Sequence, residues 1–557
     1  MGTGSKGDDY LARTKPSTRI VRWKMAPSEA NGVTNAAPSG AHTLKEIIAG
    51  DRAPVTESKG KYTPPILQLP FEVLSTIFTH LKNGKDIATI QLVSPLFRVV
   101  AIGTHSLWDS PDFRYPLLAK MFLERSGSAP VYLRFPAIVS SSYLSSSHRS
   151  FTPAMALQSH LHHTSFLDID VTTDTQEMFD YLSNPAPILR TLILKWPADI
   201  HHSSLLSTPQ LPISLLGGDC PSLTHVELTL PLTSPHWLTS LKPVVVNLVF
   251  LSLRHLSVEK PPRRPHSKDF LEVLASCSSN IQVLKLIGCL PEYTPDALKS
   301  VTLANLTTLV IRDVTLLECV HILQHLDLPN LASIAVGVIQ RDVHWFDDEQ
   351  RHSMGLKCLL KSLPLKFFES NSATLLELKL HAEAIAVWAY SMSISLSGEC
   401  DDGGVLPLMS IEVVWPSGNV DGTSIENILF DSLKLFQWPG LRSLTLDATS
   451  YAMSVNPTLL PDTLLAANIT DVHAIGKAAY PILSALQQEP VFPSLTRLHL
   501  EHVDLYECGF LLPIALRSRA NHDLPLHELI LSKCSGYSGS DLVLSAQEYV
   551  HSVAVLN

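Results

Sequence analysis

The densest group of side chains that could bind a metal ion or transfer protons lies in the segment HWFDDEQRH. His344 and His352 flank three carboxylates, Asp347, Asp348 and Glu349. Imidazole and carboxylate groups are common ligands of divalent metals. The two histidines are eight residues apart, however, and this spacing matches no standard ligand motif. We therefore interpret the segment as a solvated loop.

The other histidine-rich stretches lead to the same interpretation. His160, His162 and His163 form one cluster and His201 and His202 form another, and neither has a ligand spacing typical of a metal site. The sequence contains no GxSxG nucleophile motif and no GxxxxGK[ST] phosphate loop. We expect no catalytic residue, no metal and no cofactor. An enzyme with an unrecognised site within residues 337–373 is kept as an alternative.

Polar residues that alternate with leucines form a second group of candidates. Because successive side chains of a β-strand point to opposite faces, residues between two buried leucines face outward. These outward-facing residues predict a concave binding surface of mixed charge, and mixed charge suits a protein or peptide partner better than a polyanion. Its candidate residues are His225, Glu227, Lys285, Arg312, Glu377, Lys379, Arg497, His499 and Glu501.

These candidates belong to a repeated LxxLxL unit that must position them. Successive units begin mostly 25 to 34 residues apart, and a longer gap of 44 residues between Leu331 and Leu375 holds an insertion at about 337–373. The clear copies are Leu189/Leu192/Leu194, Leu223/Val226/Leu228, Leu253/Leu256/Val258, Ile281/Leu284/Leu286, Leu306/Leu309/Ile311, Leu331/Ile334/Val336, Leu375/Leu378/Leu380, Leu408/Ile411/Val413, Leu441/Leu444/Leu446, Leu495/Leu498/Leu500 and Leu526/Leu529/Leu531, with weaker copies at Thr164/Leu167/Ile169 and Ile469/Val472/Ala474.

Helical patterns lie between the copies, for example at 176–182, 269–277, 317–326 and 480–488. Short strands that alternate with helices at this period are typical of leucine-rich repeats. Cys289 and Cys534 follow two copies at the position where such repeats often place Asn or Cys. The fold class we predict is α/β, a solenoid in which parallel strands line the concave side of a horseshoe.

Residues 67–108 have a different, purely helical pattern. Apolar residues recur at helical spacing behind Leu69-Pro70, and proline suits the first turn of a helix. A second helical segment follows the turn at Asn83-Gly84. We expect it to restart at Pro95, with Ser94 as the N-terminal cap. About forty residues form a poor core alone, so such a unit depends on a partner.

This stretch resembles the F-box, the module that docks onto the Skp-family adaptor of cullin–RING ubiquitin ligases. Phe97 stands where many members have tryptophan, and Pro95 interrupts the second helix. The resemblance implies that the adaptor is bound through Leu69, Pro70, Glu72, Leu74, Ile77, Leu81, Leu92 and Val93. The sequence style is similar to that of fungal F-box proteins with degenerate repeats.

Composition limits the other possibilities. The net charge is −10, and residues 1–61 carry ten Lys or Arg against six Asp or Glu, so the rest of the chain is more acidic still. An acidic body argues against a nucleic-acid partner. Eight cysteines without a CxxC pair indicate a reducing compartment, cytoplasm or nucleus. No signal peptide and no membrane-spanning segment is expected.

The sequence thus predicts four parts: a disordered segment 1–62, an F-box-like module 63–110, a linker or cap 111–160, and a repeat solenoid 161–557. The implied function is substrate recognition in an SCF-type ubiquitin ligase, without a catalytic group in this chain. The F-box would hold the Skp-family adaptor and, through it, a cullin, and the repeats would hold an unknown client protein. The alternative is a repeat scaffold that takes no part in a ligase.

Overall fold

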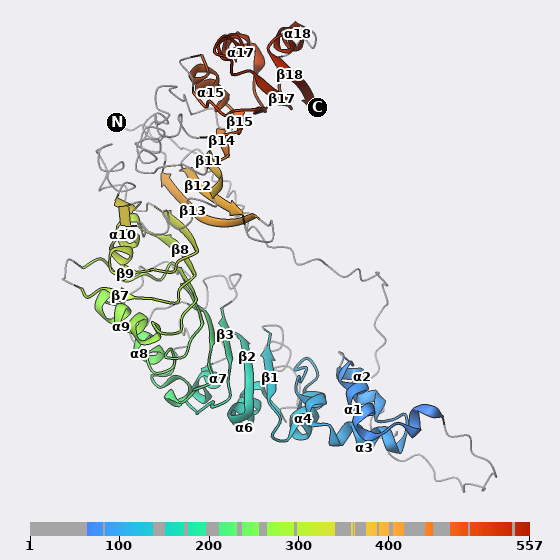
Figure 1. The fold of residues 1–557 in the computed structure, drawn as a ribbon. Coiled ribbons are helices and arrows are strands. Elements are labelled where there is room, and N and C mark those ends of the chain that lie inside the picture. Colours follow the sequence, from blue (N-terminus) through green and yellow to red (C-terminus); the bar gives the residue numbers. More distant parts are fainter. Residues whose placement is uncertain are drawn as a thin grey trace, which may run out of the picture. The chain divides into compact units, whose positions relative to one another are not determined.

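The computed structural model describes residues 64–556 apart from several gaps (Figure 1). The gaps are 82–83, 137–150, 172–175, 197–210, 231–236, 256–263, 295–297, 340–357, 360, 363–374, 387–388, 400–404, 417–440, 449–467, 488–490, 509 and 537–540. The predicted disordered segment 1–62, Asn83 and the histidines at 201, 202, 344 and 352 lie outside the described residues.

The N-terminal part of the described chain is helical. After the short helix η2 (Pro65–Gln68) come α1 (Phe71–Thr79), α2 (Gly84–Ile90), α3 (Pro95–Gly103), η3 (His105–Trp108) and α4 (Pro116–Ser126). The restart at Pro95 is confirmed, because the Ser94 side chain accepts a hydrogen bond from the Phe97 amide and caps α3. We call α1 to η3, residues 71–108, the helical module.

Sixteen strands form one sheet in the rest of the described chain. They are β1 (Val131–Phe135), β2 (Thr164–Asp170), β3 (Thr191–Lys195), β4 (His225–Leu230), β5 (Phe250–His255), β6 (Val283–Ile287), β8 (Thr308–Val314), β10 (Ser333–Ile339), β11 (Leu375–Ala386), β12 (Ala389–Glu399), β13 (Val405–Pro416), β14 (Ser443–Ala448), β15 (Asp471–Gly476), β16 (Arg497–Glu501), β17 (Leu526–Ser532) and β18 (Val550–Leu556). Strands β7 (Val301–Thr302) and β9 (Leu326–Asp327) pair separately. From β1 to β10, and again from β14 to β18, the sheet neighbours are parallel.

The leucines of the repeated unit produce this arrangement. In β3, Leu192 and Leu194 are fully buried while the residues beside them are half-buried, and β6 repeats the pattern. Helices lie between most of the successive parallel strands, whereas the described residues between β6 and β8 contain β7. α8, α9 and α10 lie along one side of their neighbouring strands (Figure 1). The helices are α6 (Pro153–His160), η4 (Leu161–His163), α7 (Gln176–Tyr181), η7 (Leu215–Gly218), α8 (Trp237–Leu241), α9 (Ser267–Cys277), α10 (Leu316–Gln324), α15 (Ala479–Ala485), α16 (Leu505–Cys508), α17 (Leu511–Asn521) and α18 (Asp541–Gln547). Among the described helices, none combines the length and the apolar character needed to cross a bilayer.

The middle of the sheet differs from the prediction of consecutive parallel repeats. The strand order there is β10-β13-β12-β11-β14, with β12 antiparallel to both β11 and β13. Only residues 387 and 388 separate β11 from β12, and a parallel connection needs a far longer crossover. In β12 the serines 391, 393, 395 and 397 alternate with larger side chains, a period-two pattern that indicates a strand.

Two of the predicted repeat frames were wrong. The sequence NLVFLSLRHLSV fits the motif twice, and the sheet uses Leu248, Leu251 and Leu253, with Leu251 beside Leu284 of β6. The copy that began at Leu253 is therefore five residues too late. Likewise Ile411 pairs with Val336 of β10 and not with Ile334, so the copy that began at Leu408 is shifted by two residues. A degenerate motif allows such shifts, and strand pairing resolves them.

Both ends of the sheet extend beyond the predicted repeats. β1 pairs in parallel with β2, so the sheet begins at Val131 and not at about residue 161, and α4 and α6 flank that strand in the chain. At the other end β18 adds a strand after the last predicted copy. β18 carries the unit with valines only, as Val550/Val553/Val555 in register with Leu526/Leu529/Leu531, and β1 lacks the first apolar residue of the unit. A search for leucines therefore did not reveal either strand.

Candidate functional site

The helical module has a small core of its own. Leu74 and Phe78 of α1 are buried, and the Phe78 ring packs edge-on against Phe97 of α3 with centroids 5.1 Å apart. Buried Trp108 donates its indole N–H to the carbonyl of Ala101 at 2.7 Å. These contacts hold α1, α3 and η3 together.

A second set of apolar side chains in the module stays exposed to solvent. Leu92 and Val93, in the turn before α3, are 68% and 64% exposed. The Phe71 ring of α1 lies over Gly103 at the end of α3, so the two helices share this side. We call these eight residues the exposed apolar set: Phe71, Val73, Ile77, Leu92, Val93, Leu96, Val99 and Ile102. Exposed apolar groups of this number indicate an interaction surface.

The predicted adaptor-binding residues fall into four groups, the last of which is buried Leu74. Ile77, Leu92 and Val93 belong to the exposed apolar set. Pro70 and Glu72 are also exposed, at the start of α1, whereas Leu69 and Leu81 are half-buried. The prediction missed five members of the set. Their signal was present in the sequence, because α1 and α3 carry more apolar residues than one buried face requires.

Leu74 was predicted to contact the adaptor, and its position corrects that expectation. Its side chain is fully buried in the core of the module. Residues 73, 74, 77 and 78 all fit one broad apolar stripe in sequence, but only 74 and 78 face α3. Leu74 therefore stabilises the helices that present the exposed apolar set.

On the sheet, the predicted partner-binding residues form two separated groups. In the first, the His225 ring stacks on Phe250 with centroids 4.0 Å apart, and the Lys285 ammonium lies 5.1 Å from the same phenyl ring. Glu227 aligns with Lys285 across β5. Arg312 is exposed on β8. The backbones of Glu377 and Lys379 lie in β11, and their side chains lie outside the described part.

The second group lies on β15, β16 and β17, where three predicted residues meet partners that the prediction omitted. Arg497 of β16 donates to Asp471 of β15 at 3.0 Å and to Glu528 of β17 at 2.7 Å. The next outward position holds His473 beside His499, with stacked rings 4.0 Å apart. We call this region the polar strand face: Asp471, His473, Arg497, His499, Glu501, Glu528 and Ser532.

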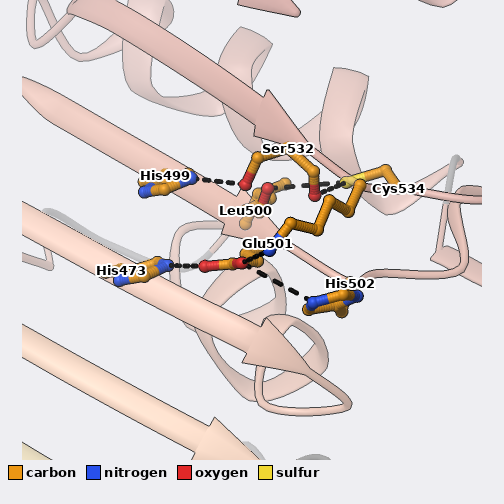
Figure 2. A network of polar contacts seen from close by, with 8 residues as sticks. His473, His499, Leu500, Glu501, His502, Ser532 and Cys534 are labelled. Atoms are coloured by element: carbon orange, nitrogen blue, oxygen red, sulfur yellow. Dashed lines mark hydrogen bonds and ion pairs between the residues drawn. The ribbon is translucent and has the colours of Figure 1, made fainter. Parts of the chain in front are cut away.

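Figure 2 shows the polar contacts of the two histidines of this face, His473 with the Glu501 carboxylate and His499 with Ser532. His473 Nε2 lies 3.1 Å from one Glu501 oxygen, Lys533 donates to the other oxygen at 3.0 Å, and His499 Nε2 lies 2.6 Å from the Ser532 hydroxyl. The hydrogen bond from Lys533 lowers the pKa of Glu501, and burial followed by the neighbouring His473 lowers the pKa of His499. Near neutral pH these shifts favour the ionised carboxylate of Glu501 and the neutral imidazole of His499.

His473 was missed because its strand copy, Ile469/Val472/Ala474, is weak. It nevertheless lies between two buried residues just as His499 does, and that position was the available signal.

The histidines His160, His162 and His163 contact one another and form a separate cluster in α6 and η4. His163 contacts His160 and His162 through its two ring nitrogens, at 3.2 and 3.0 Å.

Comparison with protein-family models gives a match that includes the helical module. Residues 66–114 match the F-box-like family model, which confirms the F-box-like resemblance of this part of the chain. F-box domains typically bind Skp-family adaptors, and an F-box suggests a substrate-adaptor role in SCF ligases. A search of curated proteins gives no match.

Proposed function

We propose that this chain is the substrate-recognition subunit of an SCF-type ubiquitin ligase. The observation that carries the proposal is the exposed apolar set on an F-box-like module whose core is already filled. In water these side chains gain from burial against a partner, at roughly 25 cal/mol per Å² of apolar surface. The Skp-family adaptor is that partner, and it connects the chain to a cullin.

The sheet domain is, in this proposal, a degenerate leucine-rich-repeat domain that binds a client protein. A ladder of asparagines supports it: Asn280, Asn305 and Asn330 each precede the first apolar residue of a unit and donate to a carbonyl of the unit before, at 3.2, 2.6 and 2.7 Å. Such a bond recurs only when units stack with a constant offset.

The two cysteines singled out in the sequence give independent support. Cys289 lies 3.4 Å from the carbonyl of Leu253, and Cys534 lies 3.4 Å from the carbonyl of Leu500. Leu253 and Leu500 are both the last leucine of the preceding unit. The thiols thus occupy equivalent places in units that are far apart in the chain.

The client would bind to outward residues of the sheet, among them the group around His225 and the polar strand face. Their charges have both signs, which suits a protein surface. The chain would contribute no catalytic group. Its effect would come from proximity, because a bound client presents its lysines at a high effective concentration to the conjugating enzyme.

Co-purification of the full chain with a Skp-family adaptor tests the proposal. We expect a stoichiometric complex with the wild type and its loss in Ile77→Asp and in the double variant Leu92→Asp/Val93→Asp. The Leu69→Ala/Pro70→Ala variant tests the start of α1. Leu117→Asp is the matched control, because Leu117 is 70% exposed on α4, outside the F-box-like match.

Thermal melting of each variant separates lost binding from lost folding. A complex that survives in the Ile77 and Leu92/Val93 variants would remove the exposed apolar set from the interface. If neither the variants nor the folded wild type form a complex with the adaptor, the result would favour the alternative, a repeat scaffold that takes no part in a ligase.

A further inference from the structure

Three potential metal ligands converge on the polar strand face. His473 of β15 and His499 of β16 are register partners on neighbouring strands, and Glu501 lies two residues beyond His499 on the same face. One ligand atom of each residue lies within 4.8 Å of the other two. All three side chains are partly buried.

The backbone beneath these residues is firmly held. Val472 and Ala474 flank His473, and Leu498 and Leu500 flank His499, and all four are buried in the core of the sheet. A metal site needs ligands on rigid elements, and strands fixed by buried neighbours provide them. Only the side chains have to move for the ligand atoms to approach one another.

We propose that His473, His499 and Glu501 form a binding site for a first-row transition metal, with Zn²⁺ as the probe ion. Two imidazole nitrogens and one carboxylate oxygen suit Zn²⁺, whereas Ca²⁺ and Mg²⁺ prefer oxygen ligands alone. With bonds of about 2.0 Å, ligand atoms of a tetrahedral site lie roughly 3.3 Å apart. Rotations of the three side chains therefore have to close a gap of about 1.5 Å or less.

The surroundings of Glu501 orient it for this role. Lys533 holds one carboxylate oxygen at 3.0 Å, which leaves the oxygen beside His473 for the ion. The ion would replace the contact between His473 and Glu501 and the contact between His499 and Ser532. The fourth coordination position stays open to water or to an anionic group of a bound molecule.

Calorimetric titration of the full chain with Zn²⁺ tests the site. We expect one ion per chain at this site and a loss of affinity of more than about 10-fold in His473→Ala, His499→Ala and Glu501→Gln, since even outer-shell partners are worth that much. His551→Ala is the matched control, because His551 belongs to another stacked histidine pair, with His527. Co²⁺ should give the intense visible absorption of a tetrahedral site in the wild type and in His551→Ala only.

Glu501→Gln keeps the shape of the side chain, so this variant is expected to fold. Circular dichroism in the absence of metal checks that each variant is folded. Unchanged binding in the three ligand variants would overturn the proposal. Binding that is lost in His163→Ala but kept in His499→Ala would assign the ion to the histidine cluster of η4 instead, and no saturable binding would exclude the site. None of these outcomes depends on adaptor binding by the helical module.

Discussion

The guanidinium group of Arg519 in α17 donates a hydrogen bond of 3.1 Å to the carbonyl of Leu495, the residue that opens the β16 unit. Its other terminal nitrogen donates to the carbonyls of Val491 and Phe492, at 2.9 and 3.2 Å. Arg519 is only 4% exposed. One buried cation thus donates hydrogen bonds to the turn that leads into β16, the strand of two of the three proposed metal ligands.

Arg519→Met should lower the free energy of unfolding by about 2–4 kcal/mol, because the carbonyls of Val491 and Leu495 lose this donor and that of Phe492 keeps the Leu495 amide. Methionine fills part of the volume and supplies no hydrogen bond. Urea unfolding measures the change. Arg517→Met, on the same helix but exposed beside Tyr549, is the control and should change the free energy by less than about 1 kcal/mol. Equal losses in both variants would show that the turn does not need Arg519.

Asn305→Ala should lower the free energy of unfolding by about 0.5–1.5 kcal/mol, since it removes the 2.6 Å bond to the Ser279 carbonyl. Asn330→Ala should have a similar effect through its bond to Ala304. Exposed Asn184, for which the described structure gives no side-chain hydrogen bond, is the control for loss of an asparagine. Urea unfolding measures the free energy of unfolding of each variant. If Asn305→Ala and Asn330→Ala lower it no more than Asn184→Ala does, the asparagine ladder does not stabilise the fold.

Leu74 and Ile77 should separate stability from binding in the helical module. Leu74→Ala opens a cavity in a small core and should cost about 2–5 kcal/mol of stability. Ile77→Ala should leave the melting temperature almost unchanged, because Ile77 is 42% exposed. Differential scanning calorimetry of the two variants checks this difference. A large loss in Ile77→Ala would mean that this side chain is structural.

The sequence predicted the parallel strands well because each clear unit places two leucines on one face, and burial of those leucines is what the sheet requires. It failed where a local motif has two solutions, as at Leu248 and Leu253, since only pairing with β6 selects the frame. It also missed β12, whose antiparallel direction depends on a short connection and not on any LxxLxL pattern. In the candidate sites the same limit applies: Leu74 and Ile77 have similar sequence environments, and only the packing of α1 on α3 separates them.

The buried histidine of η4 should make stability depend on pH. Burial, and then the neighbouring His160 and His162, lower the pKa of His163 to about 4. In the unfolded chain the pKa is near 6.5. Between these two values the unfolded chain binds more protons at this residue, so its contribution to stability is complete above about pH 6.5 and falls as the pH is lowered toward 4.

His163→Gln should remove about 1–3 kcal/mol of this pH-dependent change, because glutamine does not titrate. Urea unfolding at about pH 7 and about pH 5 gives the slope for each protein. The wild type should lose more stability than the variant over that interval. His551→Gln, at an exposed position of β18, is the control for replacing a histidine by glutamine. Equal slopes in wild type and His163→Gln would mean that His163 is protonated in the folded chain as readily as in the unfolded one.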